Sequence, residues 1–231
     1  MSKFIEVIAV VEGKTEEVFI NSLLKPYLAN KNIFMYATQV TKPGQKGGDV
    51  KFSRVKNDIE LHLKQRSDIY VTTFVDYYGV KEWPGVDAVV AGATPAEIAK
   101  TINIATKAVV VALFESERAN LRFIPYISIH EFESLLFSDP NVLSKSLTVS
   151  KDDIEELLVE QGEPEAINNS PQTAPSKRLD AWSNGKFPKT TTGIAVAKAI
   201  GISAIREKCP VFNAWLATFE KIQGVGNETQ I

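Results

Sequence analysis

Four acidic side chains come shortly after apolar segments of this 231-residue sequence. Glu12 follows one segment, Asp76 follows another, and Glu131 and Glu133 stand just past a third. Apolar segments of this kind predict buried strands, and the functional groups of α/β sheets gather at the carboxyl ends of the strands. We therefore expect these carboxylates to meet at one edge of a sheet. Their oxygens are ligands that Mg²⁺ and Mn²⁺ prefer, and a cation would relieve their mutual repulsion.

Two acids near the first two segments also have structural explanations. Glu16 lies four positions after Glu12. If a helix begins near Thr15, Glu16 lies in its first turn, where it would either face the strand end or only complement the helix dipole. The alternative for Asp76 is a loop aspartate that caps a turn. Glu12 is harder to explain structurally, because it ends a buried strand before the helix begins.

The third group of polar residues lies in the segment "HEFESLLF", for which we predict a helix through residues 130–137. On such a helix, His130 and Glu133 share one side and Glu131 points elsewhere. One of the two glutamates would face the site, and the sequence does not decide which. His130 is expected to orient a neighbour by a hydrogen bond rather than to bind a metal.

Several common catalytic motifs are incomplete in this sequence. The letters GKT after the first apolar segment suggest a P-loop, but Ile8 stands where that motif requires a glycine. The letters HEFES suggest a zinc protease, but Ser134 stands where the second histidine is required. A zinc site is disfavoured because the chain holds only His62, His130 and Cys209 as nitrogen or sulfur ligands. No nucleophile elbow is present.

Strand and helix patterns alternate in the first part of the chain, which predicts an α/β fold with a mostly parallel sheet flanked by helices. The predicted strands cover residues 4–11, 33–40, 69–75 and 123–129, and the predicted helices cover residues 15–30, a segment around 55–63, and 95–113. Strand patterns disappear from about Asp139 onward. We therefore expect an α/β domain over residues 1–138 and a helical C-terminal region, residues 139–231, packed on it.

Composition limits the environment and the partners. The single cysteine, Cys209, excludes an intrachain disulfide and fits a reducing cytoplasm. No apolar run approaches the roughly 18 residues that a membrane span needs. The net charge is −2, so contact with nucleic acid would require a local basic patch. The candidates for such contact are Lys14, Lys46 in a glycine-rich loop, and Lys177 with Arg178, near Lys186 and Lys189. The alternative for the last group is a solvated helix face.

The segment "VEGKTE" resembles the opening motif of Toprim domains, which occur in topoisomerases, primases and OLD-type nucleases. More closely, the chain resembles a Toprim-like bacterial family known as domain of unknown function 4276. The matching segments cover nearly the whole chain and are "VEGKTEEVFI", "KGGDVKFSRVKNDI", "VTTFVDYYGV", "RFIPYISIHEFESLLFSD", "PEAINN", "APSKRL" and "CPVFNAWL".

The resemblance implies a Toprim fold, which is Rossmann-like, and roles for individual residues. Glu12 corresponds to the Toprim glutamate, and Asp76 corresponds to the first aspartate of the D-x-D motif that binds Mg²⁺. The chain departs from the pattern at the second aspartate, where it has Tyr78. Glu131 or Glu133 is our candidate for the missing ligand. Gly13, Lys14, Tyr78 and His130 are expected to line the site. The resemblance also implies genes that lie beside AAA or ABC-type ATPases in defence-like systems.

The first hypothesis is a Mg²⁺- or Mn²⁺-dependent phosphodiesterase, an endonuclease of DNA or RNA that acts with an ATPase partner. Glu12 would be the general acid or base, with Glu16, Asp76 and either Glu131 or Glu133 as metal ligands. The alternative is a catalytically silent Toprim module that binds an ATPase or nucleic acid. A third reading is a phosphatase of small nucleotides. The sequence leaves the substrate and the oligomeric state open.

Overall fold

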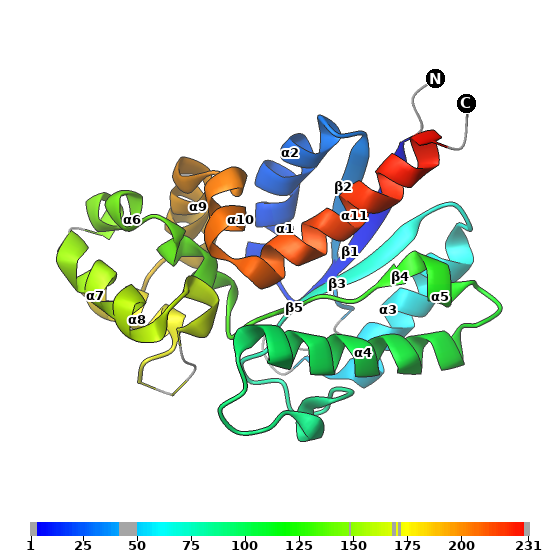
Figure 1. Ribbon diagram of the computed structural model, residues 1–231, viewed down its shortest axis with the longest axis horizontal. Helices are drawn as coiled ribbons and strands as arrows, with labels where there is room; N and C mark the ends of the chain where they lie inside the picture. Colours follow the sequence, from blue (N-terminus) through cyan, green and yellow to red (C-terminus); the bar gives the residue numbers. More distant parts are fainter. Residues whose placement is uncertain (1–3, 42–49, 148, 168–169, 171, 229–231) are drawn as a thin grey trace.

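The computed structural model describes residues 4–41, 50–147, 149–167, 170 and 172–228. Within them, five strands form one sheet in the order β2-β1-β3-β4, with β5 pairing to the last residues of β3, and each of these pairs is parallel. The strands are β1 (Ile5–Val11), β2 (Ile33–Gln39), β3 (Tyr70–Asp76), β4 (Phe123–Ile124) and β5 (Ile127–Ser128). The predicted α/β fold, a mostly parallel sheet flanked by helices, is confirmed (Figure 1).

Helices connect the strands, as parallel pairing requires. Residues 71–75 of β3 are all buried, which means that both faces of the sheet are covered at this strand. The helices of this part are α1 (Lys14–Phe19), the π-helical turn η1 (Ile20–Leu24), α2 (Lys25–Ala29), α3 (Phe52–Gln65), α4 (Pro95–Leu113) and α5 (Ala119–Arg122). Helix α4 has the predicted bounds because Thr94 and Glu97 cap each other's backbone N–H groups in front of Pro95.

The predicted strand over residues 123–129 is divided into β4 and β5. The break falls at Pro125, which has no N–H to donate to the sheet. At the next residue, Tyr126, the Thr73 hydroxyl takes the place of the backbone hydrogen bonds between the two strands. It accepts a hydrogen bond from the Tyr126 N–H at 3.0 Å and donates one to the Tyr126 carbonyl at 2.8 Å.

The prediction of an α-helix over residues 130–137 is wrong. Residues Phe132–Ser138 form the 3-10 helix η3, preceded by Glu131 in extended conformation and by His130 in the left-handed region, with φ of 62°. Two contacts to the end of β3 hold this turn: the Tyr78 N–H donates to the His130 carbonyl at 2.8 Å, and the Phe132 N–H donates to the Asp76 carboxylate at 3.0 Å. These long-range bonds compete with the local bonds of an α-helix.

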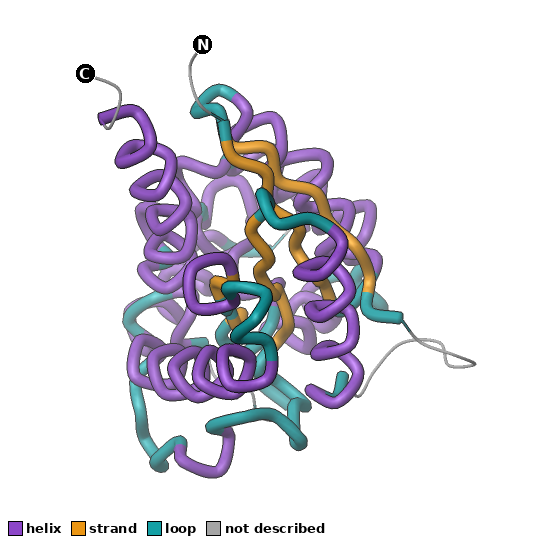
Figure 2. Tube along the Cα trace, turned by 90° about the vertical axis from the view of Figure 1, so that its right-hand side faces the viewer, coloured by secondary structure: helices purple, strands orange, loops and turns teal. Residues whose placement is uncertain are grey.

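The described residues after Ser138 form helices and connecting loops. The main helices are α6 (Pro140–Leu147), α7 (Lys151–Gln161), α8 (Pro175–Trp182), α9 (Ile194–Ile200), α10 (Ile202–Lys208) and α11 (Pro210–Glu228), with the π-helical turn η5 (Lys189–Gly193) before α9. Helix α11 returns to the sheet and runs beside it (Figures 1 and 2). The division of the chain at residues 138 and 139 stays a prediction.

Aromatic side chains join α11 to the sheet. The Trp215 indole N–H donates to the Thr72 hydroxyl of β3 at 2.9 Å. The ring of Phe212 lies 6.1 Å from that of Phe19 in α1, whose ring also contacts Phe74 and Phe132. One hydrophobic core therefore extends from the sheet into the C-terminal helices, and it fixes η3 and α11 relative to the strand ends.

Candidate metal and catalytic site

Glu12 and Asp76 lie at the same edge of the sheet. Val11 pairs with Phe74 in the parallel register of β1 and β3, and the Glu12 N–H donates to the Phe74 carbonyl at 3.2 Å. Asp76 is therefore one position beyond the level of Glu12 on the neighbouring strand. The sheet brings together two acids that are separated by more than sixty residues in the sequence.

Glu16 turns back toward the end of β1. Its Oε2 accepts a hydrogen bond from the Gly13 N–H at 3.0 Å, and its side chain is buried. Burial raises the pKa of Glu16, and the charge of Glu12 raises it further. Glu16 therefore caps the start of α1 and also lies near Glu12, and its role as a metal ligand stays a prediction.

The pKa of Asp76 identifies its neighbours. Burial raises it well above the ordinary value, and the charges of Glu16, Glu12, Glu133 and Glu131 add to this in decreasing order. One Asp76 oxygen accepts the hydrogen bond from the backbone of η3 described above. Four acids from two other segments of the chain, residues 12–16 and 131–133, thus act on one aspartate. We call these five residues, Glu12, Glu16, Asp76, Glu131 and Glu133, the acid cluster.

Glu131 is engaged by the C-terminal helices. Its Oε2 accepts a hydrogen bond from the Ser176 N–H and its Oε1 accepts one from the Ser176 hydroxyl, both at 2.8 Å. Ser176 lies in the first turn of α8, so Glu131 satisfies a backbone donor that the helix itself leaves unpaired. Both Glu131 oxygens are used in this contact.

Glu133 is the other member of the pair, and its surroundings differ. Its Oε1 lies 2.7 Å from the ammonium of Lys189 in an ion pair, and neither of its oxygens has a well-aligned hydrogen bond among the described residues. Burial raises the pKa of Glu133, whereas Lys189 opposes that shift. The sequence placed Lys189 only in a basic group of the helical part. No spacing rule could have paired it with Glu133, because the contact joins two distant segments.

His130 is buried beside these acids. Its Nδ1 has no hydrogen-bond partner among the described residues, and burial lowers its pKa to about 4, so the ring is neutral at pH 7. The predicted orienting hydrogen bond is therefore not made through Nδ1. The ring lies 6.1 Å from that of Tyr77, and the neighbouring Tyr78 contacts the His130 carbonyl through its backbone.

The predicted phosphate-binding residues lie in different places. Lys14 pairs with Glu17 at 2.8 Å and is exposed. Lys177 is exposed on α8, next to Ser176, whereas the Arg178 Nε donates to a backbone carbonyl of the preceding loop at 2.9 Å. Lys46 lies outside the described residues.

Hard carboxylate oxygens and the unpartnered Glu133 Oε2 fit a divalent cation such as Mg²⁺ by their chemistry. As the side chains lie, however, no three His, Cys, Asp or Glu residues of the described part form a group that could hold a metal ion. The acids share an edge and influence one another, but the complete ligand set that we predicted is not assembled. A metal at this site therefore remains a proposal.

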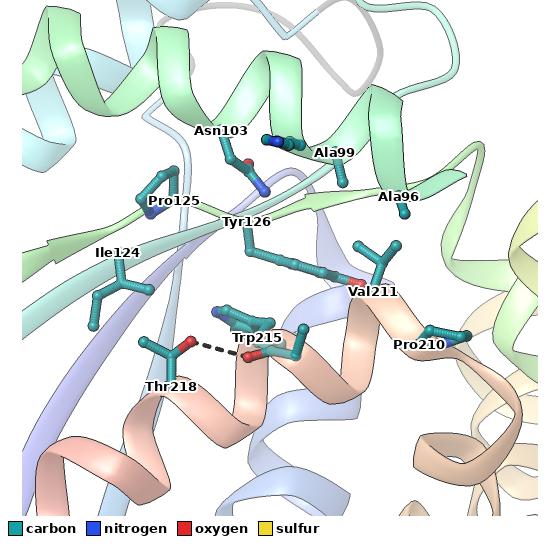
Figure 3. A pocket seen from close by; sticks show the side chains of 12 residues that line it. Ala96, Ala99, Asn103, Ile124, Pro125, Tyr126, Pro210, Val211, Trp215 and Thr218 are labelled. Carbon is teal, nitrogen blue, oxygen red and sulfur yellow. Dashed lines mark hydrogen bonds between the residues drawn. The ribbon is translucent and has the colours of Figure 1, made fainter. Parts of the chain in front are cut away.

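A cavity of about 310 Å³ lies between α4 and α11 (Figure 3). Its lining is mainly apolar and includes the rings of Tyr126 and Trp215, which stack with centroids 4.3 Å apart. None of its lining residues belongs to the acid cluster. We therefore assign the candidate chemistry to the strand ends and not to this cavity.

The fold and the acid cluster together describe a parallel α/β protein whose acidic groups gather at the carboxyl edge of its sheet. The family model described as "Domain of unknown function (DUF4276)" matches residues 11–220, and the chain belongs to this family. Among curated proteins, none shows significant similarity to the sequence. In the described residues, no helix is sufficiently long and apolar to span a membrane.

Two solved structures resemble the fold. The C-terminal region of the Burkholderia pseudomallei OLD protein has a TM-score of 0.48 and 15% identity, with 96% of this chain and 100% of that chain covered. The C-terminal region of the Xanthomonas campestris pv. campestris OLD protein has a TM-score of 0.41 and 14% identity, with 96% and 97% covered. A likeness at this level carries no conclusion about function.

Proposed function

We propose that this protein is a Mg²⁺- or Mn²⁺-dependent phosphodiesterase of the Toprim type, an endonuclease of DNA or RNA that acts with an ATPase partner in a defence-like system. The observation that carries the proposal is the position of Asp76, on which four further acids act at the sheet edge. Like charges at such a site are unfavourable unless a proton or a cation neutralises them. The resemblance of the sequence to Toprim motifs supplies the reaction class.

In this proposal the residues have separate tasks. Asp76, Glu16 and Glu133 would hold the cation, and Glu131 would keep its contact with α8. A bound divalent cation polarises the scissile phosphate and stabilises the leaving oxygen. Glu12 is only half-buried at the end of β1, so it can exchange a proton with a water molecule beside the substrate.

The second candidate is a Toprim module without catalysis that binds an ATPase or nucleic acid. Tyr78 in place of the second motif aspartate favours this candidate, as does the lack of an assembled group of three ligands among the described residues. Glu12 opposes it, because a silent module has no need of a carboxylate at this position.

Cleavage assays with Glu12→Gln distinguish the two candidates. We would incubate the purified protein with DNA and with RNA, in Mg²⁺, Mn²⁺ or EDTA, with and without its ATPase partner. The matched control is Glu17→Gln, because Glu17 lies nearby in the first turn of α1 but pairs with Lys14 and Gln39. We expect metal-dependent cleavage that is lost in Glu12→Gln and retained in the control. Equal cleavage by Glu12→Gln and wild type would reject Glu12 as the catalytic group.

A further inference from the structure

Lys189 places a cationic group inside the acid cluster. Its ammonium lies 2.7 Å from Glu133 Oε1; the Glu133 side chain is 2% exposed, whereas that of Lys189 is 42% exposed. The lysine therefore reaches from the surface to a buried carboxylate. Burial alone would lower the pKa of Lys189, but Glu133, then Glu131 and Asp76, raise it above the ordinary value. The charges of several acids of the cluster thus act on this ammonium at once.

The backbone around Lys189 is held in place. The preceding Phe187 is buried, and its N–H donates to the Asp180 carboxylate at 2.7 Å. Gly193, at the end of η5, packs so closely on Phe187 that an added Cβ would lie 3.2 Å from its ring. The Thr190 hydroxyl lies 3.4 Å from that of Thr15 in α1. The fold therefore directs this lysine toward the cluster, and the half-exposed side chain is the movable part.

We infer that Lys189 is a built-in counter-cation, which neutralises Glu133 when no divalent cation is bound and must release this carboxylate when one binds. The inference rests on the metal-binding part of the proposed function. It follows from the buried Glu133 carboxylate, which forms an ion pair with Lys189 but has no well-aligned hydrogen bond at either oxygen among the described residues. An ammonium and a divalent cation cannot share this carboxylate without repelling each other. The partial exposure of Lys189 lets its ammonium move into water.

A lysine with a purely structural role predicts a different result. In that case the ion pair would persist when metal binds, and removing the lysine would leave the metal affinity unchanged or weaken it. If Lys189 competes with the metal, its removal strengthens metal binding even though it removes a stabilising contact. The two roles therefore predict opposite changes in affinity.

The test is Mn²⁺ binding without nucleic acid, measured by the loss of the free Mn²⁺ signal in electron paramagnetic resonance. We would compare wild type, Lys189→Met, which keeps the apolar stem, and Lys186→Met, a matched control at an exposed lysine in the same segment. We expect Lys189→Met to bind Mn²⁺ about tenfold more tightly, the effect of a partly exposed like charge near the ion. The control should bind as wild type does.

Each outcome has a distinct meaning. Equal or weaker Mn²⁺ binding by Lys189→Met, with wild type binding normally, overturns the counter-cation role and leaves the proposed function intact. No Mn²⁺ binding by either protein overturns both. If Lys189→Met does not fold, amine-reactive labelling of Lys189 in the wild type decides. Labelling should rise several-fold when Mn²⁺ is added, and an unchanged rate would refute the release of the lysine.

Discussion

Replacing Glu131 by alanine tests whether this acid is a structural link or a metal ligand. Its two oxygens accept hydrogen bonds from the backbone and the hydroxyl of Ser176, and both residues are buried. A hydrogen bond to a charged group contributes about 1.5–3 kcal/mol, and two bonds to one carboxylate are not additive. We therefore expect Glu131→Ala to lower the free energy of unfolding by about 3 kcal/mol.

For a protein of 231 residues this loss is large enough to measure. About 2–4 °C of melting temperature are lost for each kcal/mol in this size range, so Glu131→Ala should melt about 6–12 °C below wild type. Circular dichroism in EDTA measures this without any contribution from metal. Ser176→Ala removes only the hydroxyl donor and should lower stability by about 1 kcal/mol. Glu160→Ala, at an exposed position of α7, is the matched control and should melt as wild type does.

Two results would refute the structural link. An unchanged melting temperature in Glu131→Ala would mean that the contact with Ser176 contributes nothing. Additive losses in the double variant Glu131→Ala and Ser176→Ala would mean that the two residues are not coupled. Loss of Mn²⁺ binding at unchanged stability would instead support the ligand role that the sequence suggested.

Two further predictions concern pH and salt. Burial raises the pKa of Glu165 from its ordinary value of 4.5 to about 7, although the N–H groups of Val211 and Phe212 bond to it. The folded state thus binds this proton more tightly, so the free energy of unfolding should fall by about 3 kcal/mol as pH rises from about 4.5 to above 7. Urea titrations should show this slope in wild type but not in Glu165→Gln, and equal slopes would contradict the assignment. Replacing both Lys177 and Arg178 by alanine should flatten the salt dependence of nucleic-acid binding by ~1 to 2 units, measured by fluorescence anisotropy. Equal affinities and slopes would exclude this pair as phosphate contacts.

The strands and the long helix could be predicted because local patterns determine them. Helix α4 has both a capping box at Thr94 and a proline at its first position, and β1 and β3 are continuous apolar segments. These signals depend on neighbouring residues only. From parallel strand order alone, it also follows that Glu12 and Asp76 occupy one edge of the sheet.

The details of the fourth predicted strand, residues 123–129, and of the turn after it could not be predicted in this way. The segment from Phe123 onward has an apolar pattern, but Pro125 and the hydroxyl of Thr73 divide it into two short strands. After it, the bonds of His130 and Phe132 to the end of β3 replace an α-helix by a 3-10 helix. Each of these contacts joins residues about fifty positions apart, and the periodic patterns of helices and strands do not predict contacts over such separations.

The same limit applies to the two glutamates of this turn. Helical spacing placed His130 and Glu133 on one side and left the choice between Glu131 and Glu133 open. The structure separates them through two partners in the C-terminal helices, Ser176 for the first and Lys189 for the second. The chemistry of each glutamate is thus set by a residue that lies far along the chain.

Two of the sequence segments that resemble the family meet at Glu131, and two more meet at Glu165. Glu131 of "HEFES" binds the first turn of α8 in "APSKRL", and Glu165 of "PEAINN" binds the first turn of α11 in "CPVFNAWL". Both contacts are buried carboxylates at helix N-termini, and neither requires a ligand or a substrate. These segments therefore include residues whose contacts hold helices of the fold in place. A family motif alone does not mark a residue as catalytic.

The contact between Glu131 and Ser176 has a consequence for the candidate site. Glu131 is two residues from Glu133, and the C-terminal helices that Glu131 holds also supply Lys189. Loosening the contact with Ser176 should therefore disturb the Glu133–Lys189 pair as well. The position of the counter-cation then depends on how the C-terminal helices dock against the sheet, which gives a partner bound to these helices a physical route to the acid cluster.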